Sequence, residues 1–191
     1  MTDELQIRPA EASDALHLAR FINAAGGGMS HYFWQTIVGE DGDPWAYGAR
    51  RALTPGSPYH YQMADLAMID GQVAGCIITY PITEAAAPAE YDDMPGIFQP
   101  LQRLEDVAVG TNYISVLSIY PEYQGKGVGR HLAERAIRSE QKDTTLIVSD
   151  DKAPAIGLYQ SLGFREADRQ PVVKEGWQTD ANYWLLMRRP A

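Results

Sequence analysis

Apolar and polar side chains follow one another along the chain in patterns that predict strands and helices in turn. Leu5–Arg8 alternates between the two kinds, which is typical of a strand, and Ser13-Asp14 then opens a segment whose apolar residues recur at helical spacing as far as Ile22. Gly26-Gly27-Gly28 ends this helix. The aromatic stretch after it is interrupted by glycine and proline, which predicts short helices joined by loops.

A hairpin is predicted in the middle of the chain. Tyr61–Ile69 and Val73–Tyr80 are two β-rich runs on either side of Asp70-Gly71, a dipeptide that strongly favours a tight turn between antiparallel strands. Residues 81–110 are richer in Ala, Pro, Glu and Asp, which indicates an excursion with a short helix at Phe98–Leu104.

The remaining elements alternate between strand and helix. Together with the first half they predict a mixed sheet with helices on both faces, an α/β architecture without internal repeats. The expected elements are a strand at Tyr113–Tyr120, a helix from Val128, a strand at Thr144–Val148, a helix at Pro154–Leu162 and a last pair of strands at Val172-Val173 and Tyr183–Met187.

Length and composition bound the class of protein. The 191 residues fit a single domain over residues 1–191, and a hydrophobic fraction of 45% provides enough apolar material for a core. The 16 Lys and Arg against 25 Asp and Glu leave a net charge of -9, which disfavours nucleic acid as a partner. This charge would attract a cationic acceptor such as an amine, although solubility alone also explains it.

Cysteine usage and hydropathy point to the cytoplasm. Cys76 is the only cysteine, so the chain forms no internal disulfide, and its apolar surroundings predict a buried strand residue. The acidic start lacks the features of a signal peptide, and no run approaches the ~20 apolar residues of a membrane span. No His, Cys or carboxylate cluster has the spacing of metal ligands, so no metal is expected.

The segment Pro121–Arg130 carries the strongest chemical signal. It joins the end of a strand to an amphipathic helix, and its three alternating glycines let backbone N–H groups approach an anion such as pyrophosphate. A P-loop would require glycine at Tyr120, and a dinucleotide fingerprint would require glycine at Arg130, so both motifs fail. A purely structural glycine turn is disfavoured because glycines opening a helix reduce stability.

The same segment resembles the GNAT superfamily of acetyl-CoA-dependent N-acetyltransferases. Gln124, Gly127 and Gly129 match its cofactor motif of Gln or Arg, two residues, Gly, one residue, and Gly or Ala. Val116–Pro121 resembles the fourth strand of that family, and Ala155–Phe164 resembles its later helix with the Leu-Tyr and Gly-Phe signature. The resemblance is sharp over about residues 113–165 and implies a mixed, mostly antiparallel central sheet with helices on both faces.

The resemblance also implies roles for particular residues. Backbone groups of the fourth strand would bind the pantetheine arm of acetyl-CoA, the glycine-rich turn would bind its pyrophosphate, and Tyr159 would protonate the departing thiolate. Lys152 stands where the family often has Asn. The implied cofactor-binding residues are Leu117, Ser118, Ile119, Gln124, Gly125, Lys126, Gly127, Val128, Gly129 and Arg130.

The general base is left open by the sequence. Relatives often place a carboxylate near the start of the fourth strand, where this chain has Thr111, Asn112, Tyr113 and Ser115. Glu105 and Asp106 lie just upstream and could reach this region through a water, although solvated loop charges are the expected interpretation.

These inferences lead to an N-acetyltransferase that moves an acetyl group to a primary amine by direct attack in a ternary complex. The alternatives are a non-catalytic CoA-binding or acyl-sensing domain, and transfer of a longer acyl group. The acceptor is not identified by the sequence. His31 and His60 are expected to be surface or packing residues. The apolar Tyr183–Met187 strand fits a homodimer seam as well as a core, and four aromatic residues fit an acceptor site as well as core packing: Trp34, Trp45, Tyr47 and Tyr59.

Overall fold

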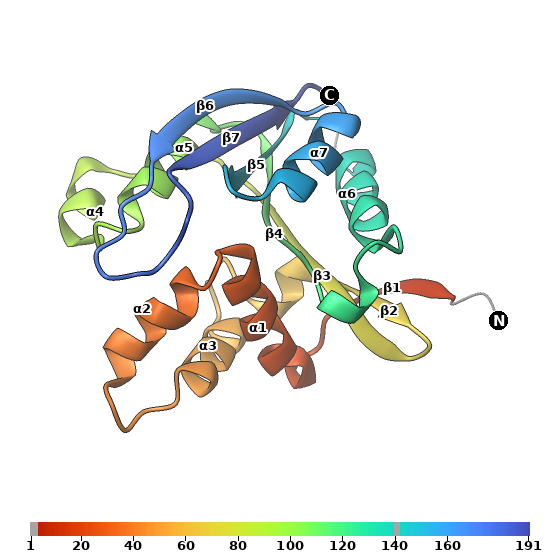
Figure 1. Cartoon of the computed structure of the whole chain (residues 1–191), viewed down its shortest axis with the longest axis horizontal. Helices are drawn as coiled ribbons and strands as arrows, with labels where there is room; N and C mark the ends of the chain where they lie inside the picture. The colour runs from red at the N-terminus through yellow and green to blue at the C-terminus, as the bar shows by residue number, and fades with distance from the viewer. Residues whose placement is uncertain (1–3, 140–141) are drawn as a thin grey trace. The chain divides into compact units, whose positions relative to one another are not determined.

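The structure, a computed structural model, describes residues 4–139 and 142–191 and contains one mixed sheet (Figure 1). Its strands are hydrogen-bonded in the order β1-β2-β3-β4-β5-β7-β6. The pairings β1–β2, β2–β3, β5–β7 and β6–β7 are antiparallel, and β4–β5 is parallel. The predicted α/β class with a mostly antiparallel sheet is therefore confirmed.

Two compact units divide the chain, and each is described by itself. The first consists of Met1–Thr79 and Val116–Arg135. It includes most of β3, the second half of β4 and the start of α6. The elements concerned are β1 (Leu5–Pro9), η1 (Ala12–Asp14), α1 (Ala15–Ala25), α2 (Met29–Val38), α3 (Pro44–Leu53), η2 (Tyr61–Met63), β2 (Ala64–Ile69), β3 (Gln72–Pro81), β4 (Asn112–Ile119), η3 (Pro121–Tyr123) and α6 (Val128–Ser139).

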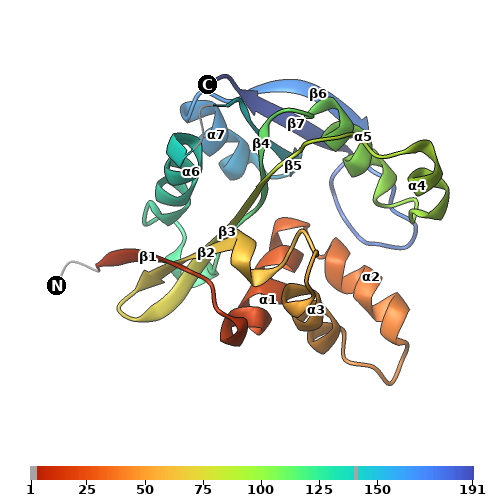
Figure 2. The same ribbon diagram turned by 180° about the vertical axis from the view of Figure 1, so that it is seen from behind.

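The β2–β3 hairpin of this unit turns at Asp70 and Gly71 and confirms the predicted turn (Figure 2). Both residues have positive φ, 50° and 76°, as a type I′ turn requires, and the handedness of that turn matches the twist of the strands. The strand β2 begins only at Ala64, because the first residues of the predicted run form the short helix η2. Cys76 of β3 is fully buried, and burial raises the pKa of its thiol.

Helix α1 is anchored by its apolar face and by a charged pair ahead of its first turn. The apolar face buries Leu18, Phe21 and Ile22, and α1 packs against α3. Ahead of the helix, Arg8 donates two hydrogen bonds to the carboxylate of buried Asp14, at 2.8 and 3.0 Å. These hydrogen bonds hold the pKa of Asp14 below its usual value. The strand β1 thereby fixes where α1 starts.

The second unit consists of Tyr80–Ser115 and Ala136–Ala191. It holds the end of β3, the first half of β4 and the end of α6. Its other elements are α4 (Pro88–Asp93), α5 (Gln99–Val107), β5 (Thr144–Ser149), α7 (Ala153–Ser161), β6 (Arg165–Pro171) and β7 (Tyr183–Arg189).

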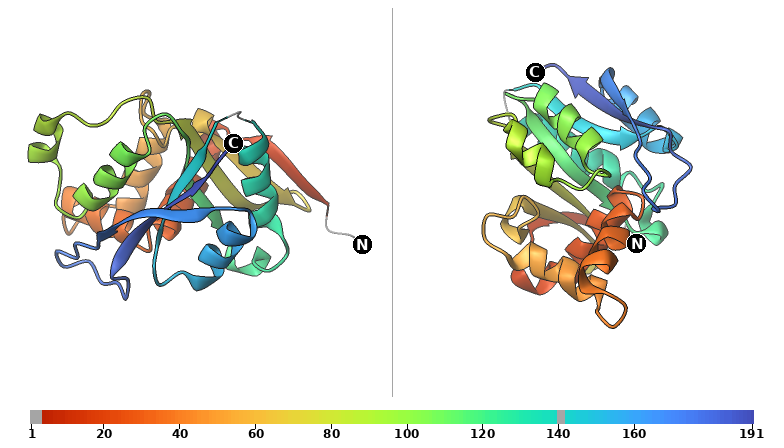
Figure 3. Two further views of the ribbon diagram at one scale, coloured as in Figure 1. Left: turned by 90° about the horizontal axis from the view of Figure 1, so that it is seen from above. Right: turned by 90° about the vertical axis from the view of Figure 1, so that its left-hand side faces the viewer.

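Strand β7 lies between β5 and β6, Figure 3 shows β6 and β7 as neighbouring blue strands, and α5 packs against β6. The core of this unit includes Leu104, Leu146, Phe164 and Leu186, all with almost no exposed surface. Strand β7 matches the prediction. The predicted partner at Val172-Val173 is wrong, because the strand β6 ends one residue earlier, at Pro171. The sequence of β6, READRQP, is polar and does not predict a strand. As an edge strand at the end of the sheet order, β6 needs no alternation of apolar residues.

Candidate functional site

The connection from β4 to α6 is the glycine-rich turn that the sequence analysis singled out. After β4 ends at Ile119, the short helix η3 leads into the exposed residues Gln124–Gly127, and α6 begins at Val128 (Figure 1). Gly125 and Gly127 have φ of 76° and 82°, a conformation that favours glycine. A Cβ built on either residue would meet no atom within 4 Å. The turn therefore has an open surface that side chains would fill.

Helix α6 begins directly at this open turn. The amide of His131 donates to the carbonyl of Gly127 at 3.1 Å, which ties the first turn of the helix to the glycine-rich turn. In general the first amides of an α-helix have no intrahelical carbonyl one turn earlier, so the start of a helix offers N–H groups to a ligand. These amides and the positive end of the helix dipole favour an anion.

Two cationic side chains flank the turn. The Nζ atom of Lys126 lies 5.4 Å from the centre of the Tyr123 ring, and a guanidinium nitrogen of Arg130 lies 3.7 Å from the carboxylate of Glu134. Lys126 is exposed, and the Arg130 side chain keeps 46% of its surface accessible. An anion in the turn would gain charge-assisted contacts from side chains of this kind.

The end of β4 is held by contacts within the first unit. Gln124 donates from Nε2 to the carbonyl oxygen of Ile119 at 3.1 Å, which closes the turn back onto the strand. On β3, a Cβ at Gly75 would lie 2.4 Å from Cδ1 of Ile119 and 3.0 Å from the carbonyl oxygen of Ser118. Glycine at position 75 therefore permits a close approach of the two strands. The sequence does not reveal the role of Gly75, since a single glycine in a strand has no distinctive spacing.

Strand β4 pairs with β5 over a short length. Among the described residues, the parallel register runs from Asn112 opposite Thr144 to Ile114 opposite Leu146. The predicted pantetheine-binding residues lie beyond this register, in the half of β4 that belongs to the first unit, and are partly exposed. They are Leu117, Ser118 and Ile119. Strand β4 also neighbours β3, so it is on the side facing β5 that its backbone groups beyond this register would need another partner, such as a ligand or water.

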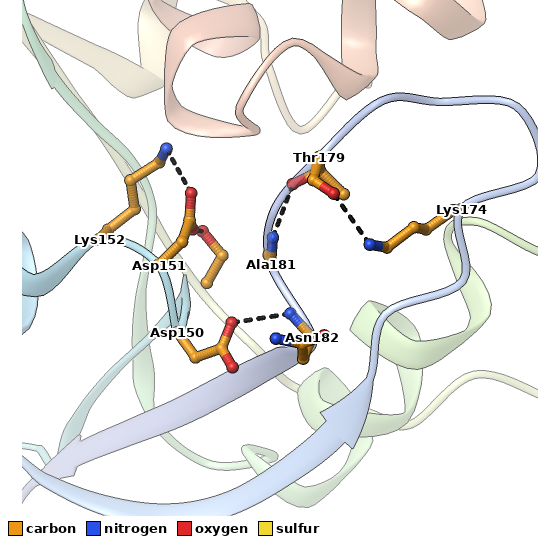
Figure 4. Close-up of polar contacts among 8 residues, drawn as sticks. Asp150, Asp151, Lys152, Lys174, Thr179, Ala181 and Asn182 are labelled. Atoms are coloured by element: carbon orange, nitrogen blue, oxygen red, sulfur yellow. Dashed lines mark hydrogen bonds and ion pairs between the residues drawn. The ribbon is translucent and has the colours of Figure 1, made fainter.

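The connection from β5 to α7 has a different character (Figure 4). Asp151 accepts hydrogen bonds from Ser149 Oγ at 2.6 Å and from Lys152 Nζ at 2.8 Å, and Asp150 accepts one from the amide of Asn182 at 2.9 Å. Lys152, which stands at the position where the resembling family often has Asn, is thus paired with its neighbour. This connection uses acidic side chains, not glycine, to satisfy polar groups.

Tyr159 lies on α7 and belongs to the second unit. Its side chain is almost completely buried, with the Phe164 ring centre 5.9 Å away at an edge-on angle of 62°. Burial raises the pKa of the phenol well above its usual value of 10.0. The hydroxyl therefore keeps its proton over the whole physiological pH range.

The two acidic residues upstream of β4 are not loop charges, so that expectation is wrong. Both lie on helix α5. Asp106 accepts hydrogen bonds from Tyr91 Oη at 2.5 Å and from the amide of Ala86 at 2.9 Å. Glu105 is partly buried, and burial raises the pKa of its carboxyl to about 7 although a hydrogen bond with Tyr113 opposes the shift. Local sequence could not reveal this, because the burial comes from tertiary packing.

The helices of the first unit hold the aromatic residues. His31 and Trp45 have ring centres 4.7 Å apart. Buried Trp34 packs directly on Gly48, since a Cβ at that position would lie 2.4 Å from the Trp34 ring. These contacts are those of packed side chains. Within the described part of the chain, no group of three metal-binding side chains is present and no helix has the length and hydropathy for crossing a membrane.

Comparisons with known proteins agree with this fold. The sequence model of the acetyltransferase (GNAT) family matches residues 28–164. The chain therefore belongs to the acetyltransferase (GNAT) family. No curated protein sequence matches the chain significantly.

Solved structures share the fold at low sequence identity. An N-acetyltransferase from Staphylococcus aureus Mu50 is 16% identical with a TM-score of 0.67, over 96% of this chain and 99% of that one. A GCN5-related N-acetyltransferase from Kribbella flavida is 23% identical with a TM-score of 0.58, over 98% of each chain. A GNAT family acetyltransferase from Elizabethkingia anophelis, with acetyl-CoA bound, is 15% identical with a TM-score of 0.58 over the full length of both chains.

Proposed function

We propose that residues 1–191 form a single N-acetyltransferase domain, which transfers an acetyl group from acetyl-CoA to a primary amine by direct attack in a ternary complex. The observation that carries this proposal is the open turn between β4 and α6, whose glycines have positive φ and free space where a side chain would otherwise lie. A pyrophosphate fits such a turn because backbone amides and the helix dipole supply complementary charge. Membership of the GNAT family and the relative with bound acetyl-CoA support this cosubstrate.

The turn supplies the binding roles. The amides of Gly125, Gly127, Val128 and Gly129 would approach the pyrophosphate, while Gln124 keeps the turn closed on the end of β4 through its bond to Ile119. Lys126 and Arg130 would add positive charge at its edge. Backbone groups of Leu117, Ser118 and Ile119 would hydrogen-bond the pantetheine arm, and one amide there would polarise the thioester carbonyl.

Tyr159 is proposed as the acid that protonates the departing sulfur. This role comes from its place in the Leu-Tyr motif of the family, and its high phenol pKa supports it because the hydroxyl remains protonated. The reaction then balances: the amine nitrogen bonds the acetyl carbon, the carbon–sulfur bond breaks, and the sulfur takes the phenolic proton. The amine must also lose a proton, which requires a separate base.

The proposal is tested by measuring CoA binding and acetyl transfer on one preparation. Calorimetry gives the affinity for CoA, and mass spectrometry of a panel of primary amines incubated with acetyl-CoA detects the acetylated products. The panel contains free lysine, a polyamine, a peptide with a free N-terminus and an aminoglycoside. An acetyltransferase binds CoA and modifies at least one acceptor at a rate proportional to enzyme concentration.

A non-catalytic CoA-binding or acyl-sensing domain is the second candidate. The pairing of Lys152 with Asp151 favours it, because a lysine engaged with a carboxylate does not offer the amide groups that the usual Asn supplies. Tight CoA binding without transfer to any amine would support the sensor and reject the enzyme. Comparing acetyl-CoA with longer acyl-CoA in the same assays decides the preferred chain length.

A further inference from the structure

A polar cluster that the sequence analysis did not identify lies at the exit of β4. The phenolic oxygen of Tyr120 is 2.7 Å from Nδ1 of His17, and the ring of Phe21 lies 4.4 Å from the Tyr120 ring, centre to centre. Arg20 also hydrogen-bonds the phenol. All four residues belong to the first compact unit, as does the proposed acetyl-CoA turn.

Helix α1 positions three of these side chains. His17, Arg20 and Phe21 are separated by three and four residues, so they lie on one face of the helix. Phe21 is buried, His17 is partly exposed and Arg20 is exposed. The apolar ring therefore fixes the helix against Tyr120, while the two polar groups remain accessible from solvent.

The backbone of Tyr120 is fixed as well. Its amide donates to the carbonyl of Ala74 on β3 at 2.9 Å, and its carbonyl accepts from the amide of Tyr123 at 2.9 Å. Tyr120 directly follows Ile119, the last of the residues proposed to bind the pantetheine arm. Its partly exposed phenol is consequently held beside the proposed acyl site within the same unit.

The hydrogen bonds define a direction for proton movement. The Arg20 guanidinium can only donate, so the phenolic oxygen accepts from it. The phenol has a single proton, which it can donate to Nδ1 of His17 when that histidine carries its own proton on Nε2. Burial raises the pKa of Tyr120, with Arg20 opposing the shift, so the phenol is neutral in the resting protein. Tyr120 thus links an outside proton donor to His17.

We infer that Tyr120 and His17 remove the proton from the acceptor amine, an assignment that rests on the proposed acetyl transfer. As the amine nitrogen bonds the acetyl carbon, its proton passes to the oxygen of Tyr120, and the phenolic proton passes to Nδ1 of His17. The resulting imidazolium returns a proton to solvent through its exposed side. The sulfur receives a different proton, from Tyr159, and the Tyr159 phenolate must regain a proton from solvent before the next turnover.

The surrounding charges are compatible with this transfer. Arg20 on α1 and Glu122 on η3 act on the phenol with opposite sign, and Cys76 on β3 is a neutral, buried thiol. Asp14 interacts with His17, but its carboxylate is already paired with Arg8 at 2.8 Å.

The competing explanation is that the His17–Tyr120 bond only holds α1 against the strand. The variants His17→Asn and Tyr120→Phe separate the two. The Oδ1 atom of Asn can replace Nδ1 as a hydrogen-bond acceptor but takes up no proton near neutral pH, so it keeps the attachment of the helix. Tyr120→Phe keeps the ring packed on Phe21 and removes only the hydroxyl. His60→Asn serves as the matched control, because His60 lies outside the cluster.

The experiment measures kcat, KM, CoA affinity and the pH dependence of kcat/KM for these proteins, with the best amine from the panel. We expect kcat to fall roughly 10²-fold in His17→Asn and in Tyr120→Phe, within the range for general acid–base catalysis. CoA affinity should stay within about twofold of wild type, because no phosphate contact is lost. In His17→Asn the pH dependence of kcat/KM should change shape, because the variant lacks the group that takes up the proton. The control His60→Asn should keep the wild-type profile.

Three outcomes contradict the inference. Wild-type kcat and an unchanged pH profile in His17→Asn would show that the bond serves only to hold the helix. In His17→Asn, kcat could fall only in step with thermal stability while a folded Tyr120→Phe protein keeps normal kcat. That result would also show that the bond serves only to hold the helix. A wild-type protein that binds CoA and acetylates no amine would overturn the proposed function, and this inference with it.

Discussion

The chain makes two strand-to-helix connections that differ in nearly every physical respect. Between β4 and α6 the turn is exposed, contains glycines of positive φ and carries Lys126 and Arg130. Between β5 and α7 the residues Asp150 and Asp151 accept hydrogen bonds from nearby groups of their own unit, and Lys152 is paired within the turn. The first connection offers an open, positively charged surface, whereas the second presents carboxylates that are hydrogen-bonded to neighbouring groups.

This difference shows that topology alone does not create a binding turn. Both helices offer the positive end of a dipole, but an anion also needs room for close approach and must avoid like charge. Glycines provide the room in the first turn, and the carboxylates of the second would repel a phosphate. The helices α6 and α7 therefore allow matched substitutions whose effects should differ in size or sign.

The largest expected effect is on CoA binding in Gly129→Glu. The substitution places a carboxylate in the first turn of α6, where the proposed pyrophosphate lies, and we expect affinity to fall by roughly 10³-fold through repulsion and lost space. The matched variant is Gly157→Glu, at an exposed position of α7 where a Cβ meets no atom within 4 Å. Calorimetry should show wild-type CoA affinity for Gly157→Glu. Equal affinities in both folded variants would contradict the proposed turn.

The next effect concerns catalysis by Tyr159, which lies on the helix α7 that follows the second connection. Tyr159→Phe keeps the packing against Phe164 and removes only the hydroxyl, so kcat should fall by roughly 10²-fold while CoA affinity changes little. Steady-state turnover and calorimetry on the same preparation measure the two quantities separately. A normal kcat would remove the acid role, and a matching loss of CoA affinity would show that the hydroxyl binds the cosubstrate instead.

A smaller effect of opposite sign is expected on stability. Gly127→Ala forces a side chain into positive φ and should lower the free energy of unfolding by about 1 kcal/mol. Gly157→Ala places alanine in the open interior of a helix and should raise it by about 0.5–1 kcal/mol. Urea unfolding of both variants tests the pair. A stabilised Gly127→Ala protein would show that the turn does not require glycine.

The smallest effect concerns Asp151 in the second connection and the pH dependence of the free energy of unfolding. Burial would raise the pKa of Asp151, but hydrogen bonds from Lys152 and Ser149 outweigh it and lower the pKa below its usual value of 3.8. A lowered pKa gives stability that is present above the usual value and is lost as pH falls through the folded pKa. Asp151→Asn should therefore lower the free energy of unfolding by about 0.5–1 kcal/mol at pH 7. Unfolding curves from pH 7 to 3 should show the difference shrinking, and a difference that is constant with pH would contradict it.

The elements that the sequence predicted well are those with local causes. The Asp70-Gly71 turn, the glycines between β4 and α6 and the apolar face of α1 all follow from residues close together in the chain. Strand β6 was missed because its polar residues do not alternate. The helix α4 was missed because its six residues, PAEYDD, form less than two turns and have no apolar face.

The candidate site divides in the same way. The anion-binding turn is contiguous along the chain, so its pattern can be recognised from the amino-acid sequence alone. His17 and Tyr120 are 103 residues apart, and no local pattern links them. Glu105 was expected to be solvated, since the packing that buries a carboxylate comes from tertiary structure alone. Proton-transfer groups assembled from distant segments are thus the part of a site that sequence patterns reveal least.

The burial of the single cysteine has a practical consequence for enzymology. Cys76 is fully buried, and its high thiol pKa leaves almost no thiolate to react with a disulfide reagent. A chromogenic thiol reagent added to the native protein would therefore react with released coenzyme A and not with the protein. The background from the folded enzyme is close to zero, and any slow signal from Cys76 would report unfolding in the same cuvette.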